Sequence, residues 1–384
     1  MNAPSDNNEV EKFSLGGGHG GYRGTIQVGL VNNMPDAAMR ATELQFARLL
    51  KESAGALDVQ LHLFSLPDIE RGEVARSRME GFYADTESLH GTGIDALIIT
   101  GAEPRATNLA DESYWPSLTQ LIDWAESGTV STMFSCLAAH AAVQHISGLE
   151  RAPLEQKKSG IFTAARVGDH LLQTGMQSRI HVPQSRRNAI PEGELASHGY
   201  RVLSRLDDGV DSFTKAMPGH SQFLFLQGHP EYSAEALGRE YLRDMGRFLR
   251  GEVERPWVPE NYFDRATENT LAELDAQAKG PEDLMRYNEV VMSALPLHSW
   301  HGHTTKLFGN WLASIAAEKL RRRAPPPRSQ EVAGLSCRFS GRFPGWQECR
   351  NRKGSMPRRP SPRRKPFVYK CIWAGRTGSW RRCI

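Results

Sequence analysis

The sequence predicts an α/β protein with a mostly parallel sheet flanked by helices. Short apolar runs that are typical of buried strands alternate with amphipathic stretches of helical length. Turn residues such as Pro67 and Gly101 end these runs. Strands that alternate with helices of about 10–15 residues indicate β-α-β units, and such units build parallel sheets.

In the first half of the chain, each predicted strand is an apolar run that stops at a turn. These strands cover residues 25–32, 57–66, 94–101 and 129–135. Three helices are expected between and after them, the first because its apolar residues fall on one helical face. They cover residues 38–52, Tyr114–Ala125 and Cys136–Ile146.

The second half continues the pattern less regularly. Residues 200–205 and 222–227 are further strand candidates, and an amphipathic helix is expected from Ala234 to Leu249. Residues 263–297 are mixed and polar, which suggests a helical excursion from the sheet. Residues 306–320 are expected to form a last helix that packs back on the domain.

Composition divides the 384 residues into three parts. Residues 1–24 are polar and Gly-rich, which predicts a flexible lead-in and no signal peptide. Residues 25–320 form the predicted catalytic domain. The chain contains no run of about 18 apolar residues, so no membrane span is predicted. Residues 321–384 hold 18 Lys/Arg and two acidic residues, whereas residues 1–320 carry a formal charge of −13. The alkaline isoelectric point of the chain therefore results from the basic residues of the tail.

The tail is predicted to be disordered, because it is rich in Arg, Pro, Ser and Gly and has no apolar period. Its basic and aromatic residues leave single-stranded nucleic-acid binding open as an alternative to an accidental extension, although we do not expect a nucleic-acid partner. Four of the five cysteines lie in this tail. A body with a single cysteine, Cys136, suits a reducing compartment, and we expect a cytoplasmic protein without a metal site.

Cys136 follows a buried strand and precedes a helix of small residues. At such an elbow the field of the helix N-terminus favours the thiolate, and the backbone N–H of Leu137 can stabilise an oxyanion. An inert core cysteine is the alternative reading of this segment. A second strand runs out into Gly228-His229-Pro230-Glu231. On extended backbone His229 and Glu231 point the same way, so the carboxylate can orient the imidazole as a general base.

An elbow cysteine followed by a Gly-His-Pro-Glu segment resembles the class I glutamine amidotransferase-like (flavodoxin-like) fold. Further segments between about residues 25 and 320 are similar, in the same order, to the homoserine O-succinyltransferase family. These segments are Asn32–Pro35, Thr42–Phe46, Thr100–Ala102, Tyr114–Pro116, Lys158–Gly160, Pro183–Arg186, Gly228–Tyr232, Leu242–Asp244, Asn261–Phe263 and Phe308–Leu312.

The resemblance implies Cys136 as nucleophile, His229 as base and Glu231 as its orienting partner. It also implies that substrate contacts are made by Lys158, Ser185 and Arg243. The oxyanion would be held by the backbone N–H groups of Leu137 and Asn33. Arg105 falls where the family discriminates acyl groups, and a guanidinium there would attract the distal carboxylate of a succinyl group.

The implied reaction is succinyl transfer from succinyl-CoA to the hydroxyl of L-homoserine through an acyl-cysteine, as in methionine biosynthesis, without a cofactor. Acetyl-CoA as donor and L-serine as acceptor stay open, and so does a homodimer. Two other classes also stay open: an amidotransferase-like hydrolase, and a non-enzymatic binding protein that has kept the fold.

Overall fold

The computed structural model describes residues 14–15, 24–278, 280–294 and 296–323. The predicted lead-in, except for residues 14–15 and 24, lies outside the described residues, and so does the predicted tail from residue 324 onward. Within the described part, no helix is both long and apolar enough to cross a membrane.

Eleven strands of the described residues form one sheet. Its parallel half confirms the predicted fold class and consists of β4, β3, β2, β5, β6 and β11. The bounds of these strands are β2 Thr25–Val31, β3 Asp58–Ser65, β4 Tyr83–Asp85, β5 Ala96–Ile99, β6 Ser131–Ser135 and β11 Gln222–Leu226. Every residue of β5 and β6 is buried, as expected of strands that are covered on both faces.

The other half of the sheet is antiparallel, and the sequence reading found only part of it. Strands β10, β9, β7 and β8 extend the sheet beyond β11, and β1 pairs with β3 at the opposite side. Their bounds are β1 Ser14–Leu15, β7 Ala152–Arg166, β8 Arg179–Ala189, β9 Arg201–Leu206 and β10 Gly209–Ala216. The long β7–β8 hairpin was not predicted, because its sequence has no regular alternation of apolar residues. Many of its residues are exposed or half-buried.

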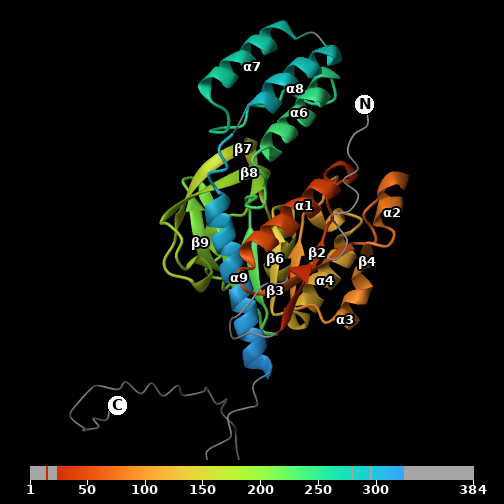
Figure 1. Ribbon diagram of the computed structural model, residues 1–384, viewed down its shortest axis with the longest axis vertical. Coiled ribbons are helices and arrows are strands. Elements are labelled where there is room, and N and C mark those ends of the chain that lie inside the picture. Colours follow the sequence, from red (N-terminus) through yellow and green to blue (C-terminus); the bar gives the residue numbers. More distant parts are fainter. Residues whose placement is uncertain (1–13, 16–23, 279, 295, 324–384) are drawn as a thin grey trace, which may run out of the picture. The chain divides into compact units, whose positions relative to one another are not determined.

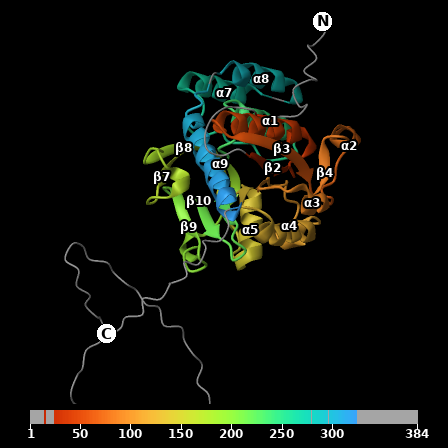
Figure 2. The same ribbon diagram turned by 60° about the horizontal axis from the view of Figure 1, so that its bottom comes forward.

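Helices cover both faces of the sheet (Figure 1; Figure 2). Helices α1 (Asp36–Ser53) and α9 (His301–Arg323) bury Phe46, Phe308 and Trp311 against one face. Helices α4 (Trp115–Gly128) and α5 (Leu137–Ser147) cover the other face, where they pack on aromatic side chains of β6, β10 and β11. Two short helices, α2 (Glu73–Met79) and α3 (Leu89–Thr92), lie in the β3–β5 connection. The predicted helices of this layer are thereby confirmed.

The predicted helical excursion is confirmed as a separate small core. Helices α6 (Ala236–Leu249), α7 (Arg265–Gln277) and α8 (Leu284–Ser293) pack around Tyr241, Leu271 and Tyr287. Figure 1 shows α7 and α8 standing beyond the ends of the strands. The segment that leads into α7 is tied to the sheet, because Glu260 bridges to Gly160 of β7. This contact attaches the small helical core to β7.

Candidate active site

Cys136 occupies a strained turn between β6 and α5. Its φ of 51° and ψ of −113° are unusual for a residue with a side chain, and such conformations cost about 1–3 kcal/mol. The turn is held by a hydrogen bond of 2.7 Å from the Cys136 N–H to the carbonyl of Leu226. The thiol is half-buried at the N-terminal end of α5. The backbone therefore presents this sulfur at the helix terminus.

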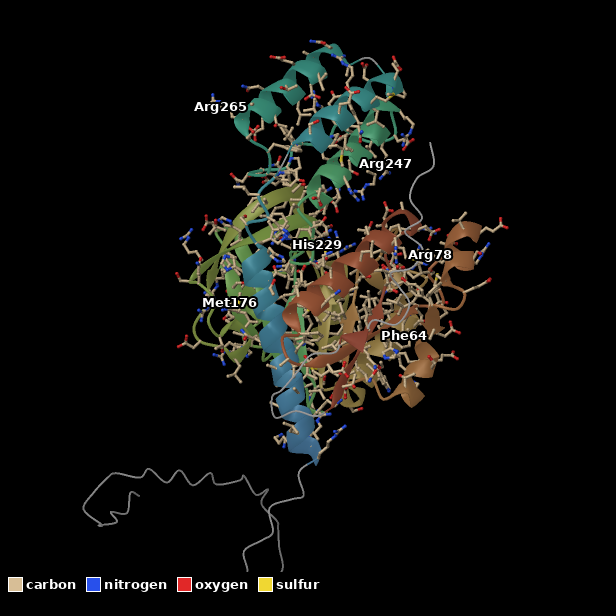
Figure 3. The ribbon with its side chains drawn as sticks, viewed as in Figure 1. Phe64, Arg78, Met176, His229, Arg247 and Arg265 are labelled. Carbon is tan, nitrogen blue, oxygen red and sulfur yellow. The ribbon has the colours of Figure 1, made fainter. Side chains whose placement is uncertain are left out.

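His229 and Glu231 follow the neighbouring strand β11. The parallel register pairs Leu226 with Ser135, so the residues just after the two strands meet at the same edge of the sheet. Nδ1 of His229 lies 2.8 Å from Oε1 of Glu231, and both side chains are buried. The Ser135 hydroxyl also donates to Oε1 of Glu231, at 3.4 Å. Figure 3 shows His229 between α6 and the parallel strands.

The charges around His229 favour its protonated, imidazolium form. Burial opposes a charge on His229, but the neighbouring Cys136 and Glu231 together raise the pKa of the imidazole well above its ordinary value. The Tyr232 ring stacks on the imidazole with ring centroids 4.3 Å apart, which holds the ring plane. A protonated imidazole beside Cys136 stabilises the thiolate, the reactive form of the residue.

Of the two N–H groups predicted to hold an oxyanion, the structure leaves that of Leu137 at the site. Leu137 is the first residue of α5, where backbone N–H groups have no helical acceptor. The Asn33 N–H instead donates to Oγ1 of Thr100 at 2.8 Å, so it is already used within the fold. Gly101 lies against Leu137: a Cβ added to Gly101 would lie 3.2 Å from the Leu137 nitrogen.

A second polar group adjoins the imidazole, centred on the carboxylate of Glu240 in α6. The Tyr232 hydroxyl donates to Oε1 at 2.5 Å, and the predicted Ser185 donates to Oε2. Lys157 Nζ lies 3.6 Å from Oε2 of Glu240 and 2.9 Å from Oδ2 of Asp244. Burial would raise the pKa of Glu240, but the charge of Lys157 and these hydrogen bonds lower it below its ordinary value. Glu240 is therefore ionised.

The remaining predicted substrate residues are dispersed. Arg243 is half-exposed on α6 and bonds to Asp244, at the border of the Glu240 group. Lys158 points away from that group, because its Nζ pairs with Asp208 at 2.5 Å and lies over the Phe162 ring. Arg105 is 74% exposed and pairs with Glu70 at 2.8 Å. Ser185 and Arg243 thus adjoin the Glu240 group, whereas Lys158 and Arg105 are paired with Asp208 and Glu70 instead.

Lys157 and Glu240 were missed by the sequence reading. A signal for Lys157 was present: neighbours in a strand face opposite sides, so Lys157 and Lys158 cannot share one site. Glu240 lies one helical turn before Arg243 and Asp244, a spacing that places all three side by side. No pattern in the sequence indicates that α6 lies above β8.

A family profile and curated relatives agree on one family. The family profile described as homoserine O-succinyltransferase matches residues 23–320. A homoserine O-succinyltransferase of Rhodopseudomonas palustris is 48% identical over 298 residues, which cover 76% of this chain and 89% of that protein. One of Bradyrhizobium japonicum is 45% identical over 295 residues, covering 76% and 90%. A solved glutamine amidotransferase of Thermotoga maritima covers 70% of this chain and 99% of its own at 13% identity, with a TM-score of 0.41.

Proposed function

This chain belongs to the homoserine O-succinyltransferase family and is a transferase, and we propose that it transfers a succinyl group from succinyl-CoA to the hydroxyl of L-homoserine. The observation that supports the proposal most is the convergence of Cys136, His229 and Glu231 at one edge of the sheet. O-Succinylhomoserine would feed methionine biosynthesis. A cytoplasmic location is part of the same proposal.

In the first half-reaction, the Cys136 thiolate attacks the thioester carbon of succinyl-CoA. The N–H of Leu137 is proposed to hold the oxyanion, together with a backbone N–H of the segment at Gly101, which lies against Leu137. The bond from carbon to the CoA sulfur then breaks. His229 gives its proton to that sulfur, so CoA leaves as a thiol and a succinyl-cysteine remains.

In the second half-reaction, neutral His229 takes the proton of the homoserine hydroxyl. The oxygen attacks the acyl carbon, the bond to Sγ breaks, and the thiolate–imidazolium pair is restored. Glu231 orients the imidazole and stabilises its charge throughout. Thiolate and imidazole supply the nucleophile and the base, so the proposed reaction includes no cofactor or metal.

The group around Glu240 suits the amino-acid end of the acceptor. The Glu240 carboxylate can accept hydrogen bonds from an ammonium group, and Lys157 and Arg243 can pair with a carboxylate. Ser185 of β8 belongs to the same group, because its hydroxyl donates to the Glu240 carboxylate. We therefore assign Lys157 to the acceptor site in place of the predicted Lys158. L-Serine, which lacks one methylene, is the competing acceptor to be compared.

The proposal is tested by intact-protein mass spectrometry with succinyl-CoA and no acceptor. The wild-type chain should gain one succinyl group on Cys136 and lose it when L-homoserine is added. Cys136→Ser should gain no adduct and turn over at least about 10³-fold more slowly, because the hydroxyl is a far weaker nucleophile. Glutamine hydrolysis without acylation would contradict the proposal and favour the hydrolase alternative.

A further inference from the structure

Arg186 of β8 is a buried cation without a carboxylate partner. Its side chain is 6% exposed and donates to Oε1 of Gln184 at 2.9 Å and to the carbonyl of Asn188 at 2.7 Å. Within the described residues, no carboxylate forms an ion pair with it. Gln184 is itself fixed, since its amide donates to the buried Asp211 at 2.8 Å. Because buried charges are normally paired, a guanidinium held in this way suits an anionic ligand.

Arg151 is a second cation with spare hydrogen-bonding capacity nearby. Its Nη2 donates to the carbonyl of Thr107 at 3.1 Å, which fixes the guanidinium against the loop after β5. Its Nη1 is buried and has no hydrogen-bond partner. Pro153 pairs with Asn188 in the β7–β8 register, and Asn188 is the residue that Arg186 binds. Arg151 and Arg186 therefore lie at the same end of the β7–β8 hairpin.

Both guanidinium groups lie close to the nucleophile. Gln184, the anchor of Arg186, packs against Gly228, and the His229 N–H donates to the carbonyl of Pro183 on the same strand. Burial lowers the pKa values of Arg186 and Arg151, and the negative charge of Cys136 is among the influences that oppose this lowering in each. His140, one turn into α5 from Cys136, is buried beside both cations. Both cations therefore lie within electrostatic range of Cys136.

We propose that Arg186 and Arg151 bind the distal carboxylate of the succinyl group while it is attached to Cys136. The inference rests on the proposed function and adds the residues that select the acyl donor. A succinyl group carries its carboxylate three bonds beyond the thioester carbon, so the anion must be held near the sulfur. The exposed Arg105, paired with Glu70, does not meet this requirement.

Arg186 and Arg151 also differ in charge from the cluster around Glu240, which is proposed to bind the acceptor. The two carboxylates of Glu240 and Asp244 are balanced there by the two cations Lys157 and Arg243, whereas Arg186 and Arg151 are both cationic. Asp208, Cys136 and Asp211 are the groups whose charge opposes the lowering of the Arg186 pKa by burial, and Asp211 is itself a buried acid whose pKa is raised by burial. The distribution of charge therefore separates an acyl side from an acceptor side around the same sulfur.

The test compares succinyl-CoA with butyryl-CoA, which has the same chain length and ends in a methyl group. The acylation rate of Cys136 is followed by mass spectrometry in wild type, Arg186→Gln, Arg151→Gln and Arg187→Gln. Arg187 is the next residue on β8 and is exposed, so its variant is the matched control. We expect Arg186→Gln and Arg151→Gln to lower the rate with succinyl-CoA about 10- to 100-fold, the usual effect of a lost charged hydrogen bond. The rate with butyryl-CoA should change less than about threefold.

Equal losses with both donors would overturn the inference, because they would mean that the arginines act on the thiolate or on the fold. Unchanged rates with succinyl-CoA would overturn it as well. If Arg186→Gln does not fold, the half-buried Arg151 decides the question alone. Failure of the proposed function is a separate result: wild type itself would then form no acyl adduct with either thioester.

Discussion

At the scale of single residues, the site combines strain with charge. Cys136 is held at a φ of 51° by its hydrogen bond to Leu226, while His229 and Glu231 are buried and bonded to each other. A conformation of this kind persists only where the surrounding structure determines it, and it is common at functional sites. The strained turn places the Cys136 thiol at the start of α5, next to the N–H of Leu137.

His140 gives a prediction on pH dependence. It is fully buried, and burial together with the charges of Arg186 and Arg151 lowers its pKa to about 3, whereas an unfolded histidine titrates near 6.5. Between these values the unfolded chain binds more protons than the folded one. The contribution of a neutral, buried His140 to the free energy of unfolding is thus fully present above pH 6.5. It is lost as the pH falls toward 3, by about 1.4 kcal/mol per pH unit at most.

Urea unfolding of wild type and His140→Gln at several pH values between 7 and 4 would check this. The variant should show a flatter decline in the free energy of unfolding, whatever its stability at pH 7. His90→Gln is the control, since His90 is exposed and should leave the slope unchanged. An identical slope in wild type and His140→Gln would show that other groups cause the decline.

At the scale of elements, the alternation of side chains along β7 and β8 places neighbouring residues on opposite faces of the sheet. In β7, Lys157 reaches Glu240 and Asp244, whereas Lys158 reaches Asp208. In β8, Ser185 faces the Glu240 group, and Arg186 shares the opposite face with Gln184. The antiparallel register pairs Ser159 with Ser185, so the two strands present matching faces. Alternation thereby separates the residues proposed to bind the acceptor from those proposed to bind the acyl group.

Adjacent lysines therefore provide an internal comparison. Lys157→Ala should raise the KM for L-homoserine at least about tenfold, because a charged contact to the acceptor is lost. Lys158→Ala should change it less than about threefold, since that lysine pairs with Asp208. Steady-state kinetics at saturating succinyl-CoA measure both. A larger effect from Lys158 would restore the prediction made from the sequence and contradict the assignment of Lys157.

At the scale of the whole molecule, the last helix joins the two halves of the sheet. Trp311 of α9 donates to Ser131 of β6, and Asn310 binds the carbonyls of Leu172 and Thr174, which precede β8. The helix continues to Arg323, and Arg322 bonds to the carbonyl of His220 at 3.1 Å. The predicted domain boundary at residue 320 would keep the contacts of Trp311 and Asn310 and would remove that of Arg322.

A chain that ends at Arg323 is expected to keep the activity and the melting temperature of the full chain. The residues beyond it have a composition without an apolar pattern that could add to the core. Differential scanning calorimetry and the acylation assay would check this, with a chain that ends at Leu320 as comparison. Loss of either property at Arg323 would show that the basic segment contributes to the folded protein.

The sequence alone predicted the α/β class, the family resemblance and the three candidate residues Cys136, His229 and Glu231, because each depends on patterns within short segments. Apolar runs mark buried strands wherever they lie, and an elbow cysteine and a Gly-His-Pro-Glu turn are legible without knowing their distance. Only the tertiary structure decided which neighbours face the site. Lys157 rather than Lys158, Glu240, Arg151 and Arg186 gain their positions from strand pairing and from α6 above the sheet. Those contacts join residues up to 87 positions apart, and no local period records them.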